Sequence, residues 1–267
     1  MREPLFKLSA KSAEVEDQIH YVADQGFAGV EDNCLATRTR IEQQRMGAAL
    51  RARGLHIGCF VFGFDHMMHP LWNRAGAEAL RRLRREYAIC REAADRTGGK
   101  YVTVVTGREE SVTDEHQIEC LTDNLRLLAL DAERDGLIFC LEPVSRNRVP
   151  QMLVQELGAA YRIVKAVNSP SVKLIYDTCH VSHMAGSLTQ NYLLYRDEIA
   201  VVQLADMPNR VAPGSGCLEL IPLLKAMLDG KYRGHFELEC VPAYGGVEGE
   251  LAVISSLQTI DAHFGQA

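Results

Sequence analysis

The sequence predicts a single (β/α)8 barrel, the TIM-barrel fold of the α/β class, over residues 1–267. The chain has 267 residues, of which 47% are hydrophobic, and this is enough to build the core of one large domain. Short apolar runs alternate with longer segments of helical period along the whole chain. The first of these runs is followed by Leu8-Ser-Ala-Lys-Ser-Ala13, which lacks the glycine-rich phosphate turn of doubly wound open sheets.

Eight apolar runs of strand length are predicted to form the barrel wall. They cover residues 5–8, 28–31, 56–62, 101–105, 137–142, 172–177, 201–204 and 235–240. Eight segments of helical period follow them, at residues 13–25, 39–53, 74–97, 114–135, 155–167, 188–197, 218–228 and 249–264. Eight strand-helix units in a chain of this length match the (β/α)8 barrel.

Glycines mark the returns from helix to strand. Gly26, Gly54, Gly98, Gly136 and Gly234 each stand shortly before a predicted strand, where a helix ends most easily on glycine. The connections are therefore short, as a barrel requires. In the segment 74–97, five arginines lie mostly off the apolar stripe, so we expect a solvated face there rather than a nucleic-acid-binding surface.

The overall charge and the cysteines limit the partners and the compartment. With 35 acidic and 29 basic residues the formal charge is −6, which disfavours nucleic acid or an anionic membrane as a partner. The eight cysteines are scattered and form no Cys-x-x-Cys pair, so we expect free thiols in a reduced compartment. No apolar stretch reaches signal-peptide or membrane-spanning length, and we expect a cytoplasmic protein.

Four residues with side-chain oxygens close four successive predicted strands: Glu142, Asp177, Gln203 and Glu239. They are 35, 26 and 36 residues apart, which corresponds to one strand-helix unit each. The active sites of such barrels lie at the carboxyl ends of the strands, so we expect these side chains to meet there. Buried carboxylates need a cation, and oxygen donors without thiolate or imidazole favour Mn²⁺ or Mg²⁺ over Zn²⁺.

Other polar residues near the strand ends leave alternatives open. Any single strand-end carboxylate can instead be bonded to a loop amide. Glu237 lies on the same side of its strand as Glu239, and we assign Glu239 to the metal and Glu237 to a deeper position. His66 and His69 have a ligand-like spacing, but a loop that walls the pocket is the preferred interpretation. Glu31 is predicted to line the mouth, and Glu109-Glu110 to be a solvated loop end.

The motifs around the four strand ends resemble a known family. Leu-Glu142-Pro, Tyr-Asp177-Thr-Cys-His180, Gln203-Leu-Ala-Asp206-x-x-x-Arg210-x-x-Pro213-Gly-x-Gly216 and Gly234-x-x-x-Leu-Glu239 are similar to those of the xylose-isomerase-like TIM barrels. Within these, they most resemble hydroxypyruvate isomerase and related sugar isomerases and ketose epimerases. The resemblance runs through the whole chain, but its specific motifs lie in the second half.

The resemblance implies roles for six residues. It implies that Glu142, Asp177, Gln203 and Glu239 bind the metal, that Glu142 and Glu239 are also the acid/base pair, and that His180 and Arg210 contact the substrate. From the residues alone, His180 can instead be a structural histidine, and Arg210 a surface arginine tied to Asp206. Many relatives have histidine at the third ligand position, whereas the hydroxypyruvate isomerase branch has glutamine, as here. Two features depart from the branch: Cys240 stands where tyrosine is common, and residues 144–148 are unusual.

These observations predict a divalent-metal-dependent isomerase that acts on a small α-hydroxycarbonyl acid or sugar. The specific expectation is hydroxypyruvate isomerase, with a ketose 3-epimerase or an inosose dehydratase as the alternatives on the same scaffold. A non-catalytic protein that binds hydroxy acids is a further alternative. A repair endonuclease of the same fold is disfavoured by Gln203 and by the net negative charge. A homo-oligomer formed through the outer helices fits such a barrel.

Overall fold

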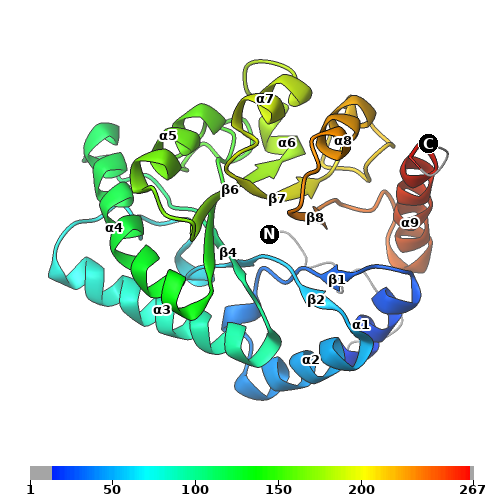
Figure 1. Ribbon diagram of the computed structural model, residues 1–267, viewed down its shortest axis with the longest axis horizontal. Coiled ribbons are helices and arrows are strands. Elements are labelled where there is room, and N and C mark those ends of the chain that lie inside the picture. The colour runs from blue at the N-terminus through cyan, green and yellow to red at the C-terminus, as the bar shows by residue number, and fades with distance from the viewer. Residues whose placement is uncertain (1–13, 265–267) are drawn as a thin grey trace.

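The computed structural model describes residues 14–264, in which parallel strands surround a centre and helices cover them from outside (Figure 1). The (β/α)8 class predicted from the sequence is confirmed. The strands are β1 (Gly29–Val30), β2 (His56–Ile57), β3 (Phe60–Val61), β4 (Tyr101–Val104), β5 (Ile138–Leu141), β6 (Val172–Asp177), β7 (Ile199–Leu204) and β8 (His235–Leu238). The predicted strand at residues 5–8 lies outside the described residues.

The helices follow the strands in regular alternation. They are α1 (Val15–Asp24), α2 (Arg40–Arg53), α3 (Ala77–Thr97), α4 (Asp114–Asp135), α5 (Leu157–Val167), α7 (Leu188–Tyr195), α8 (Leu220–Asp229) and α9 (Gly246–Ala262). Three short pieces were not predicted: η2 (Leu35–Thr37), η3 (Phe64–His66) and α6 (Thr178–Val181). All three lie in loops that follow strands, at the end of the barrel where the predicted site residues stand.

The sheet is wholly parallel where its pairing is described. One ladder joins β3 through β8 in chain order, and a second joins β1 to β2. In the β6–β7 ladder, Asp177 is the partner of Gln203, and in the β7–β8 ladder Gln203 is the partner of Glu237. Because the strands are parallel and in register, the side chains that end β5 to β8 emerge from the same end of the barrel.

The predicted strand at residues 56–62 is instead two short strands that pair with different neighbours. Gly58 and Cys59 separate β2, which pairs with β1, from β3, which pairs with β4. The Glu237 carboxylate lies against this break: its Oε1 accepts from the Cys59 N–H at 2.8 Å. A Cβ on Gly58 would overlap Oε1 and approach Glu237 Cδ to 2.9 Å, so the break needs glycine.

Local signals explain why the long helices begin and end where they do. The Thr39 side chain and Glu42 form a capping box at the start of α2, and Gly54 in the left-handed region ends it. Thr113 caps α4 and Gly136 ends it in the same way. The predicted apolar stripe of α3 is confirmed, since Leu83, Tyr87, Cys90 and Ala94 are buried there while none of its arginines is buried.

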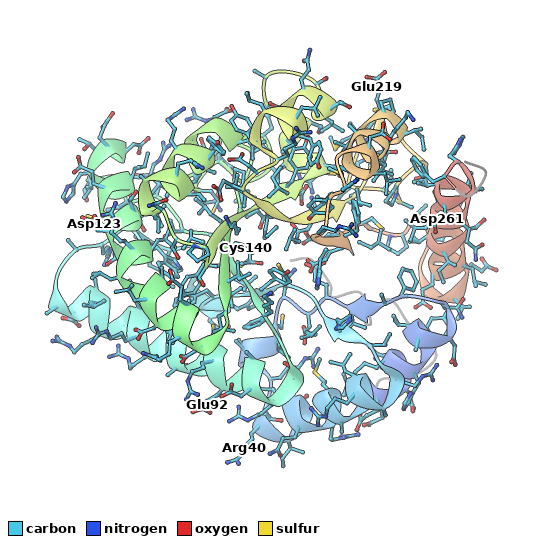
Figure 2. All side chains as sticks on the ribbon, viewed as in Figure 1. Arg40, Glu92, Asp123, Cys140, Glu219 and Asp261 are labelled. Atoms are coloured by element: carbon cyan, nitrogen blue, oxygen red, sulfur yellow. The ribbon has the colours of Figure 1, made fainter. Side chains whose placement is uncertain are left out.

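The core has three parts. The largest part lies between the helices and the sheet. A second, inside the barrel, consists of Cys59, Cys140, Ile175 and Val201, and Figure 2 shows Cys140 near the centre while Glu92 and Asp123 lie toward the outside. The third packs Val61, Val105, Val144 and Met152 against the loop that follows β3.

The eight cysteines all lie within the described residues. All eight cysteines are free, as predicted, and Cys217 is the exposed one among them. In the portion 14–264, no helix is both long and apolar enough to cross a bilayer.

Candidate active site

The four predicted ligand residues lie at the carboxyl ends of four neighbouring strands. Glu142 directly follows β5, Asp177 ends β6, Gln203 lies near the end of β7, and Glu239 directly follows β8. All four side chains are buried, with 1–6% of each residue exposed. Strand order places Glu142 and Glu239 on the two sides of the Asp177–Gln203 pair. The sequence prediction of one shared location is therefore consistent with the arrangement of the strands.

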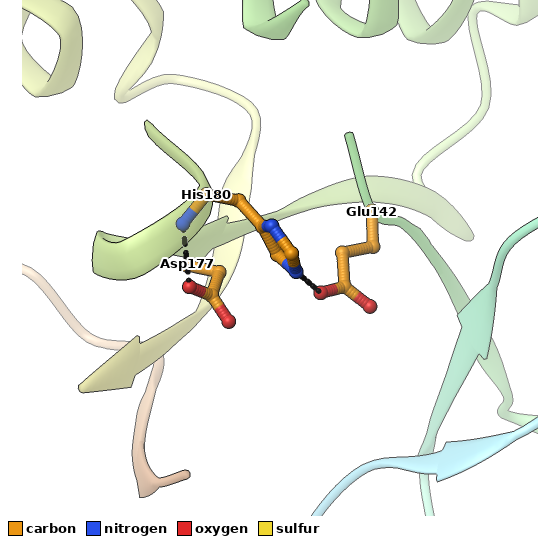
Figure 3. A group of neighbouring side chains, drawn as sticks. All are labelled: Glu142, Asp177 and His180. Atoms are coloured by element: carbon orange, nitrogen blue, oxygen red, sulfur yellow. Dashed lines mark hydrogen bonds and ion pairs between the residues drawn. The ribbon is translucent and has the colours of Figure 1, made fainter. Parts of the chain in front are cut away.

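His180 lies between Glu142 and Asp177 (Figure 3). Its backbone N–H donates to Asp177 Oδ1 at 2.9 Å, because Asp177 caps the short helix α6. Its imidazole Nε2 lies 3.6 Å from Glu142 Oε1. One potential ligand atom from each of the three residues falls within 4.8 Å of the others, a spacing compatible with a metal ion.

Ser145 sets the orientation of the His180 ring. The Ser145 backbone N–H donates to His180 Nδ1 at 3.3 Å, and the Ser145 hydroxyl lies 3.2 Å from the same nitrogen. In a neutral imidazole with Nδ1 as acceptor, the proton is on Nε2 and faces Glu142. Neither ring nitrogen then offers a lone pair to a cation in this arrangement. This favours carboxylate and amide oxygens as the ligand set, with His180 beside it.

Arg210 joins two of the predicted ligands. Its Nη1 donates to Asp177 Oδ1 at 3.2 Å, and its Nη2 donates both to Asp177 Oδ2 and to Glu239 Oε2, the latter at 2.8 Å. Burial alone would lower the pKa of the guanidinium, but the Asp177 and Glu239 carboxylates raise this pKa above its usual value. Arg210 therefore carries its full charge next to the predicted ligands.

The loop that carries Arg210 is organised by Asp206. The Asp206 carboxylate accepts four backbone N–H groups, from Met207, Gly214, Gly216 and Leu218, at 2.7–3.1 Å. The alternative in which Arg210 is a surface arginine tied to Asp206 is therefore wrong, because backbone amides occupy that carboxylate and Arg210 is buried. Two of these four donors, Gly214 and Gly216, are the glycines of the Pro213–Gly216 turn.

Gln203 is held in one orientation by Glu31, at the end of β1. Its amide Nε2 donates to Glu31 Oε1 at 3.1 Å. The opposite atom, Gln203 Oε1, is buried and has no hydrogen-bond partner within residues 14–264. An orphaned buried carbonyl oxygen is costly unless a ligand satisfies it, and a hard cation prefers such an oxygen. Carboxylate and amide oxygens of this kind are the donors that Mg²⁺ or Mn²⁺ prefers, but among the described residues the group whose ligand atoms fall within 4.8 Å contains Glu142, Asp177 and His180 and does not include Glu239.

The two glutamates of β8 have different partners. The Glu239 carboxylate contacts Arg210 and also Asn33, whose Nδ2 lies 3.4 Å from Glu239 Oε1. Glu237 faces Cys59 instead, and burial raises its pKa to about 8, with a smaller contribution from repulsion by Glu239. Glu237 is thus an inner-barrel acid that stays largely protonated near neutral pH.

The remaining predicted candidates stand away from this cluster. His69 is exposed and His66 half-buried, and among the described residues neither belongs to a group of three potential metal ligands. Their loop is fastened to the next one, because Gly107 N–H donates to the His69 carbonyl at 3.1 Å. The interpretation as a pocket wall fits this better than a second metal site. Glu109 pairs with Arg74 near the surface.

Two residues of the cluster were missed from the sequence. Ser145 follows Glu142 by three residues, inside the segment 144–148 that departs from the family pattern. Asn33 follows Glu31 by two residues, in the loop after β1, and contacts Glu239 after β8. A polar residue shortly after a strand-end carboxylate is the available signal in both cases, and it is too common to single these residues out.

Comparison with known proteins gives likenesses both in sequence and in structure. The chain is 27% identical to hydroxypyruvate isomerase of Escherichia coli over 146 residues, which cover 54% of this chain and 57% of that protein. It is 26% identical to 3-dehydro-D-guloside 4-epimerase of Escherichia coli over 233 residues, 84% of this chain and 86% of that protein. The match thus spans little more than half of the isomerase and most of the epimerase.

Among solved structures, one titled AP endonuclease, family 2, from Brucella melitensis superposes with a TM-score of 0.80. It covers 94% of both chains at 22% identity, a likeness that establishes the fold alone. The model of the xylose isomerase-like TIM barrel family matches residues 19–261. With the strand-end residues placed as described, and with relatives named as isomerases and epimerases, the chain belongs to the xylose isomerase-like TIM barrel family.

Proposed function

We propose that this chain is a divalent-metal-dependent isomerase that converts hydroxypyruvate to tartronate semialdehyde through an enediolate. The observation that carries the proposal is the buried Gln203 Oε1, left without a hydrogen-bond partner in the described chain beside the carboxylates of neighbouring strand ends. The proposed ligands are Glu142, Asp177, Gln203 and Glu239. Oxygen donors of this kind suit Mn²⁺ or Mg²⁺.

The cation would supply Lewis acidity, which stabilises the negative charge that develops on the substrate oxygens during proton abstraction. The protein residues supply the proton transfers. Glu142 and Glu239 come from β5 and β8, on the two sides of the proposed ligand pair, and we assign them as the acid/base carboxylates. One removes a proton from the hydroxyl-bearing carbon, and a proton is returned to the neighbouring carbon. The carbonyl group thereby moves by one position.

His180 and Arg210 are assigned to substrate binding. The proton on His180 Nε2 faces Glu142 Oε1 at 3.6 Å and can orient that carboxylate for proton abstraction. Arg210 has a further donor, its Nε, which is buried and has no hydrogen-bond partner in the stretch 14–264. A planar guanidinium with donors of this kind matches a substrate carboxylate. An anionic substrate such as hydroxypyruvate is consistent with it.

Proton exchange with solvent tests the proposal directly. Metal-loaded protein is incubated with hydroxypyruvate in ²H₂O, and the product is analysed by NMR spectroscopy. We expect a product whose carbonyl has moved and whose new C–H position carries solvent deuterium. Deuterium in recovered hydroxypyruvate whose carbonyl has not moved would show proton abstraction without isomerisation, and epimerisation is tested with a chiral ketose, in which label enters while the carbonyl stays in place. Binding of hydroxypyruvate without any exchange would overturn the proposed isomerisation and support the non-catalytic hydroxy-acid-binding alternative.

A ketose 3-epimerase or an inosose dehydratase is the second candidate on the same residues. One observation favours an epimerase: the likeness to the Escherichia coli 4-epimerase spans 84% of this chain, against 54% for the isomerase. In that reaction the proton returns to the same carbon from the opposite face, so both carboxylates are needed but the carbonyl stays in place. Parallel assays with ketoses and 3-keto sugars distinguish the two candidates.

The other expectations concern partners and compartment. The formal charge of −6 and the family membership support a small molecule rather than nucleic acid as the partner, although one structural neighbour carries an endonuclease title. Eight free cysteines suit a reduced, cytoplasmic environment. A homo-oligomer built through the outer helices stays a proposal, and light scattering of the purified protein tests it.

A further inference from the structure

The positively charged guanidinium of Arg210 lies between two proposed metal ligands, where a metal ion would otherwise balance their negative charge. Its guanidinium donates to three carboxylate oxygens, two on Asp177 and one on Glu239. The three side chains are 1–4% exposed, so water does not screen their charges effectively. Two buried carboxylates this close to one positive charge are stabilised by it, and without any cation they would repel each other.

The hydrogen bonds use oxygen lone pairs that a metal would also need. A carboxylate offers about four acceptor sites. At least three of those on Asp177 are taken, because Oδ1 accepts from the His180 N–H at 2.9 Å and from Arg210 Nη1, and Oδ2 accepts from Arg210 Nη2. Glu239 accepts from Arg210 at Oε2 and from Asn33 at Oε1. By contrast, Gln203 Oε1 receives no donor in the described region.

The backbone conformation of the loop places the Arg210 side chain beside Asp177 and Glu239. Its φ of 61° lies in the left-handed region, and Asn209 before it has a φ of 66°. The Arg210 carbonyl accepts from the Val241 N–H at 2.7 Å, which ties the loop to the segment that follows Glu239. This bond and the four amide bonds to Asp206 fix the loop. The loop therefore holds the Arg210 guanidinium within the carboxylate cluster, away from the surface.

We propose that Arg210 is an internal counter-cation that holds Asp177 and Glu239 together in the metal-free protein, and that a divalent ion must compete with it for these carboxylates. This inference rests on the proposed metal site. Metal binding would release guanidinium donors from Asp177 and Glu239 and make them available to an anionic substrate. Metal would therefore bind before substrate, and the metal affinity would be lower than the four ligands alone could give.

The test measures Mn²⁺ binding and metal-free stability in Arg210→Gln. After removal of metal with a chelator, calorimetric titration with Mn²⁺ should give a dissociation constant more than about tenfold lower in Arg210→Gln than in the wild type, because like charges held close together oppose binding. The metal-free variant should melt at a lower temperature than metal-free wild type, and Mn²⁺ should raise its melting temperature by more.

Two further variants complete the design. Arg210→Lys keeps a positive charge but loses the planar fork that spans both carboxylates, so an intermediate dissociation constant is expected; it serves as the main test if Arg210→Gln does not fold. Arg126→Gln is the matched control: Arg126 lies on the outer helix α4, about half of its side chain is exposed, and it pairs with Asp123 on the same helix. Its Mn²⁺ affinity should stay within about twofold of wild type, since a distant charge is screened.

The outcomes separate this inference from the proposed function. Equal or weaker Mn²⁺ binding by both Arg210 variants, with normal binding and turnover in the wild type, overturns the competition and leaves the metal-dependent isomerase intact. Mn²⁺ binding by the variants but not by the wild type supports the competition. An absence of Mn²⁺ binding in every protein removes the proposed metal site, and the competition with it.

Discussion

The amide of Gln203 donates to the carboxylate of Glu31 at 3.1 Å, across 172 positions of the chain. This bond joins the end of β7 to the end of β1 and fixes which end of the amide points away from Glu31. The carbonyl oxygen is thereby presented to the carboxylates of the neighbouring strands. A residue that orients a ligand in this way affects metal affinity without touching the metal.

Glu31→Ala is therefore expected to weaken Mn²⁺ binding by about 10- to 100-fold, because the freed amide can rotate and offer its nitrogen instead of its oxygen. Calorimetric titration measures the change. Glu110→Ala, at an exposed position on the loop after β4, is the matched control and should bind Mn²⁺ as the wild type does. Unchanged affinity in Glu31→Ala would show that Gln203 needs no support from Glu31.

Glu142→Gln and Glu239→Gln are each expected to lower turnover about 10²- to 10⁴-fold, since an amide keeps the shape of the side chain but cannot accept the substrate proton. Solvent deuterium exchange into substrate should fall in parallel with product formation. Thermal melts of the same preparations check that the fold is kept. If both variants turn over normally, the assignment of these two carboxylates as acid and base has to be abandoned.

Gly58→Ala is expected to destabilise the fold by about 1–3 kcal/mol, because the new methyl group would overlap the Glu237 carboxylate at the break between β2 and β3. Urea denaturation measures the loss. Gly245→Ala is the control, since nothing lies within 4 Å of a Cβ there and its φ of −75° suits any residue. Combining Gly58→Ala with Glu237→Ala should give less than the sum of the two losses, and strict additivity would contradict the contact.

Asp206→Asn is expected to destabilise the protein by about 1.5–3 kcal/mol, because an amide replaces one of the two oxygens that accept backbone N–H groups. The loop between β7 and α8 should also become more open to proteolysis. Asp261→Asn on the exposed side of α9 is the control for the same change in charge. A stability equal to wild type would mean that the loop is held by other contacts.

The pKa of His235 predicts a loss of stability in mild acid. Burial lowers this pKa below 6.5, with further contributions from His56 and Lys100, and the ring packs edge-on against Tyr101 at 4.7 Å. A lowered histidine pKa means that the unfolded chain binds the proton more readily, so this contribution is complete above about pH 6.5 and is lost as the pH falls toward the folded pKa. Urea denaturation between pH 7.5 and 5.5 should reveal a decline.

His235→Gln should make that decline shallower, because the substituted side chain no longer takes up a proton on unfolding. His263→Gln, at an exposed position after α9, is the control and should leave the slope unchanged. An identical slope in wild type and His235→Gln would assign the acid sensitivity to other groups. His235 starts β8, at the end of the barrel opposite to Glu239, so this measurement is separate from metal binding.

The sequence was sufficient for the barrel and for the placement of the four candidate residues at one end of it. Residues 172–177 and 114–135 were predicted with the bounds that β6 and α4 have, because each carries its own signals: an apolar run ended by Asp177, and a threonine cap followed by a terminating glycine. The convergence of four strand ends follows from parallel topology alone. Such features are local or repetitive, and a single sequence contains them.

The remaining features depend on contacts between distant residues. Within residues 56–62 only Gly58 signals a break, and its cause is a distant contact, because Glu237, 178 positions from Cys59, accepts from the Cys59 N–H. From the sequence alone, Arg210 could pair either with Asp206 or with a substrate carboxylate. In the folded loop, four backbone N–H groups donate to the Asp206 carboxylate, and the Arg210 guanidinium donates to Asp177 and Glu239 instead.

The single exposed thiol of the chain gives experimental access to this loop. Cys217 lies between Gly216 and Leu218, both of which donate to Asp206, and its own N–H donates to the Met207 carbonyl at 2.9 Å. Five of the other cysteines are buried and two are half-buried. A maleimide fluorophore would consequently attach first at Cys217 and place an optical reporter on the loop that carries Arg210.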